Sequence, residues 1–143
     1  MYRDLSALSI VARSFFQKDT NTVARHLLGM YLVRHIDDTA CIGRIIETEC
    51  YTADDPACHA YRGKTARNAS LFGQQGRAYV YLIYGIHYCF NVVAYDATQQ
   101  RAGGVLIRSV IPIYNQKRIA ERRNRAEHDP QITNGPGKVA QAF

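Results

Sequence analysis

Two acidic side chains near the end of an extended segment are the first candidates for chemistry. Glu47 and Glu49 are two positions apart, so on a strand both carboxylates point to the same face. Tyr51, two positions further on, shares that face. A carboxylate beside tyrosines in a cleft serves as a general base or stabilises positive charge, whereas strand-end glutamates are more often only solvated. The spacing alone does not decide between the two acids.

A stretch without acids adds the chemistry of nucleic-acid binding. Residues 56–95 contain no Asp or Glu but carry six tyrosines. The basic residues of this stretch are Arg62, Lys64, Arg67 and Arg77. This mixture suits the holding of phosphates and stacking on bases, in a chain of formal charge +6. A second basic run, residues 117–125, fits a solvated helix face at least as well as a DNA contact.

The cysteines argue against metal chemistry. The four of them, Cys41, Cys50, Cys58 and Cys89, form no C-x-x-C pair, unlike the cysteines of compact zinc sites. We expect reduced thiols in or near the core. The alternative is a metal held by Cys50, Cys58, His59 and Cys89, which their wide spacing disfavours. We therefore expect neither a metal nor a cofactor.

Apolar spacing predicts helices near both ends of the chain and strands between them. The predicted helices are residues 5–15, 20–28 with Thr20-Asn21 as cap, 115–127, and one that starts at 135–138. The predicted strands are residues 30–36, 40–49, 78–83, 87–93 and 105–111. Asp55-Pro56 is suited to open one helical turn, and residues 63–76 are expected to form an ordered loop. Gly85 lies between two strands and can take the positive φ of a tight hairpin tip.

These elements predict an α+β fold. We expect a single mixed domain over residues 1–143, with a mainly antiparallel sheet, flanking helices and a protruding β-hairpin. No window has the 18 or more apolar residues of a membrane span, and charges fall throughout the first thirty residues. We expect a soluble, unexported monomer that is cytoplasmic, associated with the nucleoid in a bacterium or nuclear in a eukaryote.

Several motifs, in order along the chain, resemble the alkyladenine (3-methyladenine) DNA glycosylases. The motifs are ARHLLGMYLV (24–33), RIIETECY (44–51), CH (58–59), TARN (65–68), AYVYLIYGIHYCFNV (78–92), VLIR (105–108) and NGPGKVAQAF (134–143). The resemblance implies a monofunctional enzyme that flips a damaged purine out of duplex DNA and hydrolyses its N-glycosidic bond with an activated water. Its partner would be double-stranded DNA that contains alkylated or deaminated purines.

The resemblance assigns the catalytic pair. Glu49 corresponds to the base that activates water for attack on C1′ of the deoxyribose, and Arg108 to the arginine that helps hold this water and a phosphate. Glu47 is left as a supporting residue. An ordinary salt bridge at the rim of the site is the alternative for Arg108.

The resemblance also implies a base pocket, in which Tyr51 and His59 lie on one side of the purine and Tyr81 on the other. Asn91 corresponds to a residue that crowds the 2-amino group of guanine, an unfavourable contact that gives selectivity. Ordinary strand packing is the alternative for the tyrosines, and a backbone hydrogen bond is the alternative for Asn91.

Four further residues correspond to DNA-binding positions. Tyr84, at the hairpin tip, would enter the minor groove and fill the gap left by the flipped nucleotide. Arg67, Asn68 and Lys138 correspond to positions near the DNA backbone, and Gly135-Pro136-Gly137 is suited to present N–H groups to a phosphate.

The chain departs from the family pattern at His87, at Lys64-Thr65-Ala66 and at its end. Family members continue past QAF, so the chain is expected to be truncated and weakly active or inactive. Two alternatives therefore stay open. One is a catalytically impaired DNA-binding fragment that recognises distorted duplex without base release. The other is an RNA or single-strand binding module, which has no use for Glu49 or Arg108.

Overall fold

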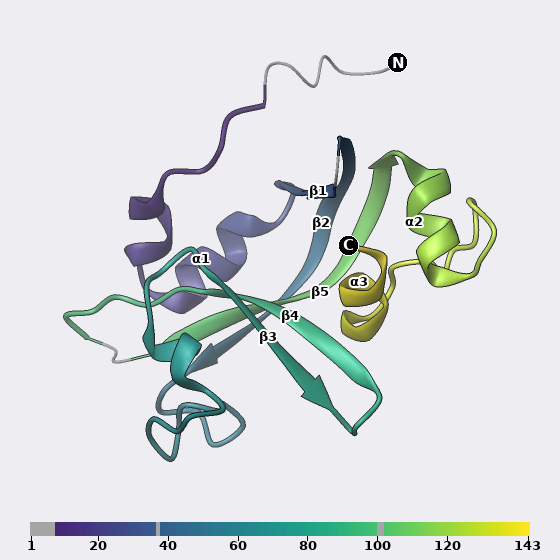
Figure 1. Ribbon diagram of the computed structural model, residues 1–143. Helices are drawn as coiled ribbons and strands as arrows, with labels where there is room; N and C mark the ends of the chain where they lie inside the picture. The colour runs from purple at the N-terminus through teal and green to yellow at the C-terminus, as the bar shows by residue number, and fades with distance from the viewer. Residues whose placement is uncertain (1–7, 37, 100–101) are drawn as a thin grey trace.

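A computed structural model describes residues 8–36, 38–99 and 102–143 (Figure 1). Within these ranges, five strands form one antiparallel sheet in the order β1-β2-β5-β4-β3. The strands are β1 (Tyr31–Ile36), β2 (Thr39–Thr52), β3 (Ala78–Ile83), β4 (His87–Val93) and β5 (Gly103–Tyr114). The helices are α1 (Thr20–Leu27), α2 (Gln116–Arg123) and α3 (Pro136–Ala142), with 3₁₀ helices η2 (Arg13–Gln17) and η3 (Ala69–Phe72). The predicted α+β class is confirmed.

The long pair of β2 and β5 forms the centre of the sheet. Glu49 lies opposite Leu106, and Glu47 lies opposite Ser109. The register shifts on both sides of Glu47, as at a β-bulge, which bends a strand and re-aims its side chains. This pairing brings the two glutamates next to Arg108, about 60 positions later in the sequence.

One of three buried apolar clusters among the described residues lies between α1 and this central pair. Val23, Ala24 and Leu27 of α1 pack with Val105 and Ile107 of β5 in one buried cluster. Burial of the apolar face of a helix this short supplies most of its stability. None of the helices among the described residues has the length and apolar character needed to cross a membrane.

The N-terminal predictions need two corrections. Of the predicted helix 5–15, residues 5–7 lie outside the described residues, residues 8–12 are not helical, and Arg13–Gln17 forms η2. Leu8 and Val11 are exposed, so the predicted apolar face has nothing to pack on, and a short helix is marginal alone. The cap of α1 is Asp19, which accepts from the Thr22 N–H at 2.9 Å, because the Thr20 hydroxyl donates to Ala94 O instead.

Other boundaries also differ from prediction, and β2 continues past Glu49 to Thr52. Strand β5 continues through Pro112 to Tyr114, because β4 pairs only with residues 104–106 and the missing N–H can face away from β2. Helix α2 ends at Arg123 instead of residue 127, because Asn124 takes a left-handed φ of 50°. Asp55 accepts from the Ala57 N–H in a turn, not in a helix. The predicted start of α3 at residues 135–138 is confirmed, with Pro136 in the first turn.

The predicted hairpin of β3 and β4 is present, and Figure 1 shows its tip near the bottom of the view. Tyr84 and Gly85 both have positive φ, 54° and 70°, and Ile86 N–H donates to Ile83 O at 3.2 Å. Two consecutive left-handed residues make the type I′ turn that suits a two-residue hairpin. A bulky residue such as Tyr84 seldom takes this conformation, so the turn holds it at a cost in stability.

Candidate active site and base recess

A cluster of two carboxylates and one guanidinium lies on the central strand pair. Nε of Arg108 donates to Oε1 of Glu47 at 2.9 Å, and Nη1 donates to Oε2 of Glu49 at 2.5 Å. The Arg108 side chain is 36% exposed, that of Glu49 40% and that of Glu47 54%. Ion pairs this open to water add little to stability. The cluster is therefore better explained by fixing the orientation of these three side chains than by stabilising the fold.

Arg108 hydrogen-bonds both carboxylates, but only Glu49 lines a cleft with it. The hydrogen bonds that Arg108 donates, first to Glu47 and then to Glu49, raise its pKa, so the guanidinium stays charged. Glu49 lines a neighbouring cleft of about 520 Å³, as does Arg108, whereas Glu47 does not line it. Only one of the two acids that the sequence left in competition therefore reaches the cleft.

The cleft has walls from three parts of the chain, of which the central strand pair supplies Glu49, Tyr51, Leu106 and Arg108. The hairpin supplies Tyr81, Ile83, Tyr84, His87 and Cys89, and the helical C-terminal region supplies Arg123, Gly135, Pro136, Gly137 and Lys138. The β-carbon of His87 lies so close to Gly137 that a side chain there would come within 3.3 Å. The hairpin and the start of α3 thus stand directly against each other at one side of the cleft.

A smaller recess adjoins the cleft and contains all four predicted base-binding residues. It has a volume of about 150 Å³ and is lined by Tyr51, His59, Tyr81 and Asn91, among others. Tyr51, Tyr81 and Ile83 line both spaces. The recess is about the size of an engineered cavity that holds benzene. One ring of a purine matches it, and the rest of the molecule would extend into the cleft.

The aromatic walls of the recess are uncharged. Burial, followed by the charge of Arg67, lowers the pKa of His59. Burial, followed by a hydrogen bond to Glu49, raises the pKa of Tyr51 to about 12, and burial also raises the pKa of Tyr81. Neutral aromatic faces are suited to stacking, and they favour a cationic base through cation–π attraction.

His59 and Tyr81 are in direct contact. Their ring centroids are 4.4 Å apart at an angle of 64°. A base stacked between two rings needs a gap of roughly 7 Å, that is, two contacts of about 3.5 Å. Insertion of a purine between His59 and Tyr81 therefore requires these rings to separate.

Asn68 lies inside the loop that carries His59. Its Nδ2 donates to His59 O at 2.7 Å and to Gly63 O at 3.0 Å, and its Oδ1 accepts from the Thr65 N–H at 2.6 Å. The residue is 4% exposed. Asn68, predicted to bind DNA, is therefore engaged within the protein, where it fixes the backbone at His59.

The other predicted DNA-binding residues lie at the surface around the hairpin and α3. Tyr84 is 85% exposed. Nη2 of Arg67 donates to Leu82 O on the hairpin at 3.1 Å, and Nζ of Lys138 donates to Asn134 Oδ1 at 2.7 Å. Arg67 thus contacts the hairpin two residues before Tyr84, and Lys138 lines the same cleft as Tyr84.

Sequence reasoning missed three residues of the site. Tyr79 and Gly104 line the recess, and Arg123, from a run interpreted as a solvated helix face, lines the cleft. A β-carbon at Gly104 would come within 3.0 Å of Leu71 Cδ1, so the glycine leaves room in the recess. The Gly103-Gly104 pair before an apolar strand was the signal that could have indicated it.

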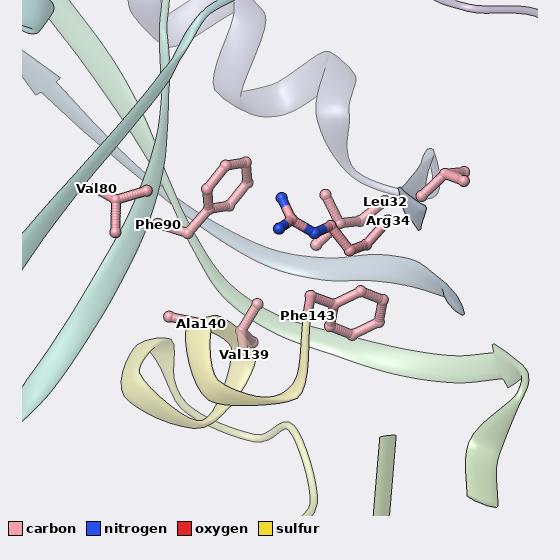
Figure 2. A pocket seen from close by; sticks show the side chains of 8 residues that line it. Leu32, Arg34, Val80, Phe90, Val139, Ala140 and Phe143 are labelled. Carbon is pink, nitrogen blue, oxygen red and sulfur yellow. The ribbon is translucent and has the colours of Figure 1, made fainter. Parts of the chain in front are cut away.

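A separate apolar cavity is lined by residues of β1, β3, β4 and α3 (Figure 2). It has a volume of about 300 Å³, and Leu32, Phe90, Val139 and Phe143 are among its lining residues. Its one charged lining residue is Arg34, so it lacks the paired groups needed for acid–base chemistry.

The four cysteines are free, as predicted. Cys41, Cys58 and Cys89 are buried, and Cys50 is partly buried. Burial raises the pKa of Cys50 to about 11 and also raises that of Cys58. Both thiols are therefore protonated near neutral pH, a form with little nucleophilicity.

Comparison with known proteins agrees with the sequence motifs. Residues 14–143 match the family described as Methylpurine-DNA glycosylase (MPG). A relative from Carboxydothermus hydrogenoformans is 46% identical over 134 residues, which are 94% of this chain and 69% of the relative. One from Koribacter versatilis is 45% identical over 97% of this chain and 67% of its own length, and one from Methanoculleus marisnigri is 45% identical over 91% and 66%. All three are named "Putative 3-methyladenine DNA glycosylase".

Proposed function

Because the chain belongs to the methylpurine-DNA glycosylase family, we propose that it is a monofunctional DNA glycosylase of base-excision repair. Its substrate is duplex DNA with an alkylated or deaminated purine. Such purines include 3-methyladenine. The observation that carries this proposal is the position of Glu49 and Arg108 in a cleft that shares Tyr51 and Tyr81 with an aromatic recess. A base in the recess would leave its sugar beside the carboxylate.

Glu49 activates the nucleophilic water in this mechanism. Its Oε2 is held by Arg108, which leaves the carboxylate fixed in one orientation toward the cleft. The carboxylate takes a proton from water as the water oxygen bonds to C1′, the N-glycosidic bond breaks, and the base leaves with the bonding electrons. A positioned general base contributes typically about 10²- to 10⁴-fold to the rate. The products are the free base and abasic DNA.

The recess offsets part of the energy needed to flip the base. Extrusion of a nucleotide costs a few kcal/mol, least for a damaged base. Each aromatic stacking contact returns about 1–3 kcal/mol, and Tyr51 and Tyr81 both border the recess and the cleft. Tyr84 fills the gap in the duplex, and Arg67 and Lys138 bind phosphates. Asn68 acts indirectly, because it holds the loop of His59.

A base-release assay tests the function. Duplexes with one hypoxanthine or one alkylated purine are incubated with the protein and then treated with alkali, which cleaves at abasic sites. We expect cleavage that depends on the protein and on the lesion. Binding of lesion DNA without cleavage would support instead the impaired DNA-binding fragment, which the contact between His59 and Tyr81 favours. Binding of single strands alone would contradict both.

Substitution of Asn91 is expected to change selectivity among purines. Asn91 is 4% exposed, lines the recess and donates to Tyr79 O at 3.3 Å. Asn91→Ala enlarges the recess where a 2-amino group would lie, so slow release of guanine should rise roughly tenfold relative to hypoxanthine, within the range of small steric differences in pockets. Single-turnover release of both bases measures this ratio. An unchanged ratio in a folded variant would leave Asn91 only its backbone hydrogen bond.

A further inference from the structure

Arg123 is a cation of the cleft whose charge is not paired with any carboxylate of the described residues. It belongs to α2 and lines the cleft together with Lys138. Neither of these two side chains takes part in an ion pair with a described residue. Arg108 also lines the cleft, but Glu47 and Glu49 both pair with it. The positive charge that the cleft can offer to a ligand therefore comes from Arg123 and Lys138.

Neutral acceptors hold both of these cations in place. Nε of Arg123 donates to Ile132 O at 3.0 Å, and Nη1 donates to Oε1 of Gln141 on α3. Nζ of Lys138 donates to Oδ1 of Asn134 at 2.7 Å. These partners restrain the two side chains without cancelling their charges, so an anion is attracted at a smaller cost in side-chain entropy.

The segment 132–134, which supplies two of these acceptors, is anchored to the strand that carries Arg108. Its central residue, Thr133, is 2% exposed. The Thr133 hydroxyl donates to Val110 O at 2.6 Å, and the Thr133 carbonyl accepts from the Val110 N–H at 3.3 Å. Val110 lies on β5, two residues after Arg108. This buried, doubly bonded anchor fixes the two cations relative to Arg108 and to Glu49, which pairs with it.

We propose that Arg123 is a DNA-binding residue, which together with Lys138 binds a phosphate group next to the flipped nucleotide. The proposal rests on the proposed function for the presence of DNA in the cleft. A base in the recess leaves its sugar beside Glu49, and the phosphates attached to that sugar are then the anions nearest to the cleft. A guanidinium is the side chain best suited to them, because its planar fork can donate two parallel hydrogen bonds to one phosphate.

A duplex with one uncharged backbone position tests this contact directly. The probe is a duplex with a tetrahydrofuran analogue of an abasic site, which has no base to release. Two further duplexes carry a methylphosphonate, an uncharged substitute for phosphate, on the 5′ or the 3′ side of the analogue. Arg123→Gln should bind the unmodified duplex at least about tenfold more weakly than the unaltered protein, as for loss of one hydrogen bond to a charged group. With the methylphosphonate at the contacted position, both proteins should bind equally, because the contact is already lost.

Arg118→Gln is the matched control. It removes the same charge from the same helix, but Arg118 pairs with Glu121 at 3.5 Å and does not line the cleft. Its affinity for the unmodified duplex should change less than about twofold, because an exposed ion pair of this kind contributes little. Arg123→Gln should also reduce the slope of log affinity against log salt concentration by about one, as for loss of one phosphate contact.

Two results overturn the proposal. One is equal affinity of Arg123→Gln and the unaltered protein for the unmodified duplex. The other is a loss of affinity that is the same on all three duplexes, which would leave Arg123 a residue that only supports the cleft wall. If Arg123→Gln does not fold, the unaltered protein still decides, because one of the two methylphosphonates must weaken its binding. Base release by the unaltered protein is measured separately, so these results can remove the phosphate contact and leave the glycosylase function intact.

Discussion

Glu49→Gln is expected to slow base release by about 10³-fold, within the range typical of a general base, while binding to lesion DNA changes little. The amide keeps the size of the side chain, and its carbonyl oxygen can still accept the Arg108 Nη1–H that Glu49 accepts at 2.5 Å. It no longer takes a proton from water. Single-turnover excision of hypoxanthine measures the chemical step, and a binding titration with the same duplex measures affinity.

Glu47→Gln is the matched control for this experiment. Glu47 accepts from the same arginine at 2.9 Å, undergoes the same chemical change, and does not line the cleft. We expect less than about a tenfold loss of rate, because only the support of Arg108 weakens. Excision that survived Glu49→Gln but failed in Glu47→Gln would show that the catalytic acid is the other member of the pair.

Tyr84→Asn is expected to have opposite effects on stability and on DNA binding. Asn tolerates the left-handed conformation that Tyr84 holds at φ 54°, so the melting temperature should stay the same or rise by a few degrees. The loss of a ring that is 85% exposed in the free protein removes contacts made only with DNA. Affinity for a lesion duplex should fall at least about tenfold, as for loss of one stacking contact.

Tyr88→Asn tests whether this effect is specific to the tip. Tyr88 is also an exposed tyrosine of the hairpin, at 58%, but it does not line the cleft. The Tyr88→Asn variant should bind lesion DNA as tightly as the unaltered protein does. A Tyr84→Asn protein that melted well below the unaltered one and bound DNA equally well would show that Tyr84 is a structural residue. It would not then be the side chain that fills the gap left by the flipped nucleotide.

The sequence predicted the elements whose signals are local. Alternation of apolar residues around Gly85 indicated the hairpin, and Pro136 after Gly135 indicated the start of α3, because φ preferences of single residues decide such boundaries. The end of β5 could not be predicted from such local signals. Pro112 is a strand breaker in general, and its tolerance depends on which neighbouring strand is present at that point.

The candidate site residues were predicted from motifs, whereas their contacts could not be deduced from motifs. Tyr79 and Tyr81 occupy equivalent positions in the alternation of β3, yet Tyr79 is buried against His59 and Tyr81 borders the cleft. Asn68 has the residue type of a DNA-backbone contact, but three backbone groups of its own loop bind its side chain. Only the tertiary arrangement shows whether a residue borders the cleft or is bound within the protein.

The strand order has a consequence for how the enzyme folds. Strands β1 and β2 form one local hairpin, β3 and β4 form another, and β5 enters between them. Contacts between distant segments form late and slowly, since the entropy of closing the long loop comes first. Glu49 belongs to the first hairpin and Arg108 to the inserted strand. A nascent or partly folded chain therefore lacks the assembled pair proposed for catalysis, and the proposed capacity to release damaged bases arises only when β5 closes the sheet.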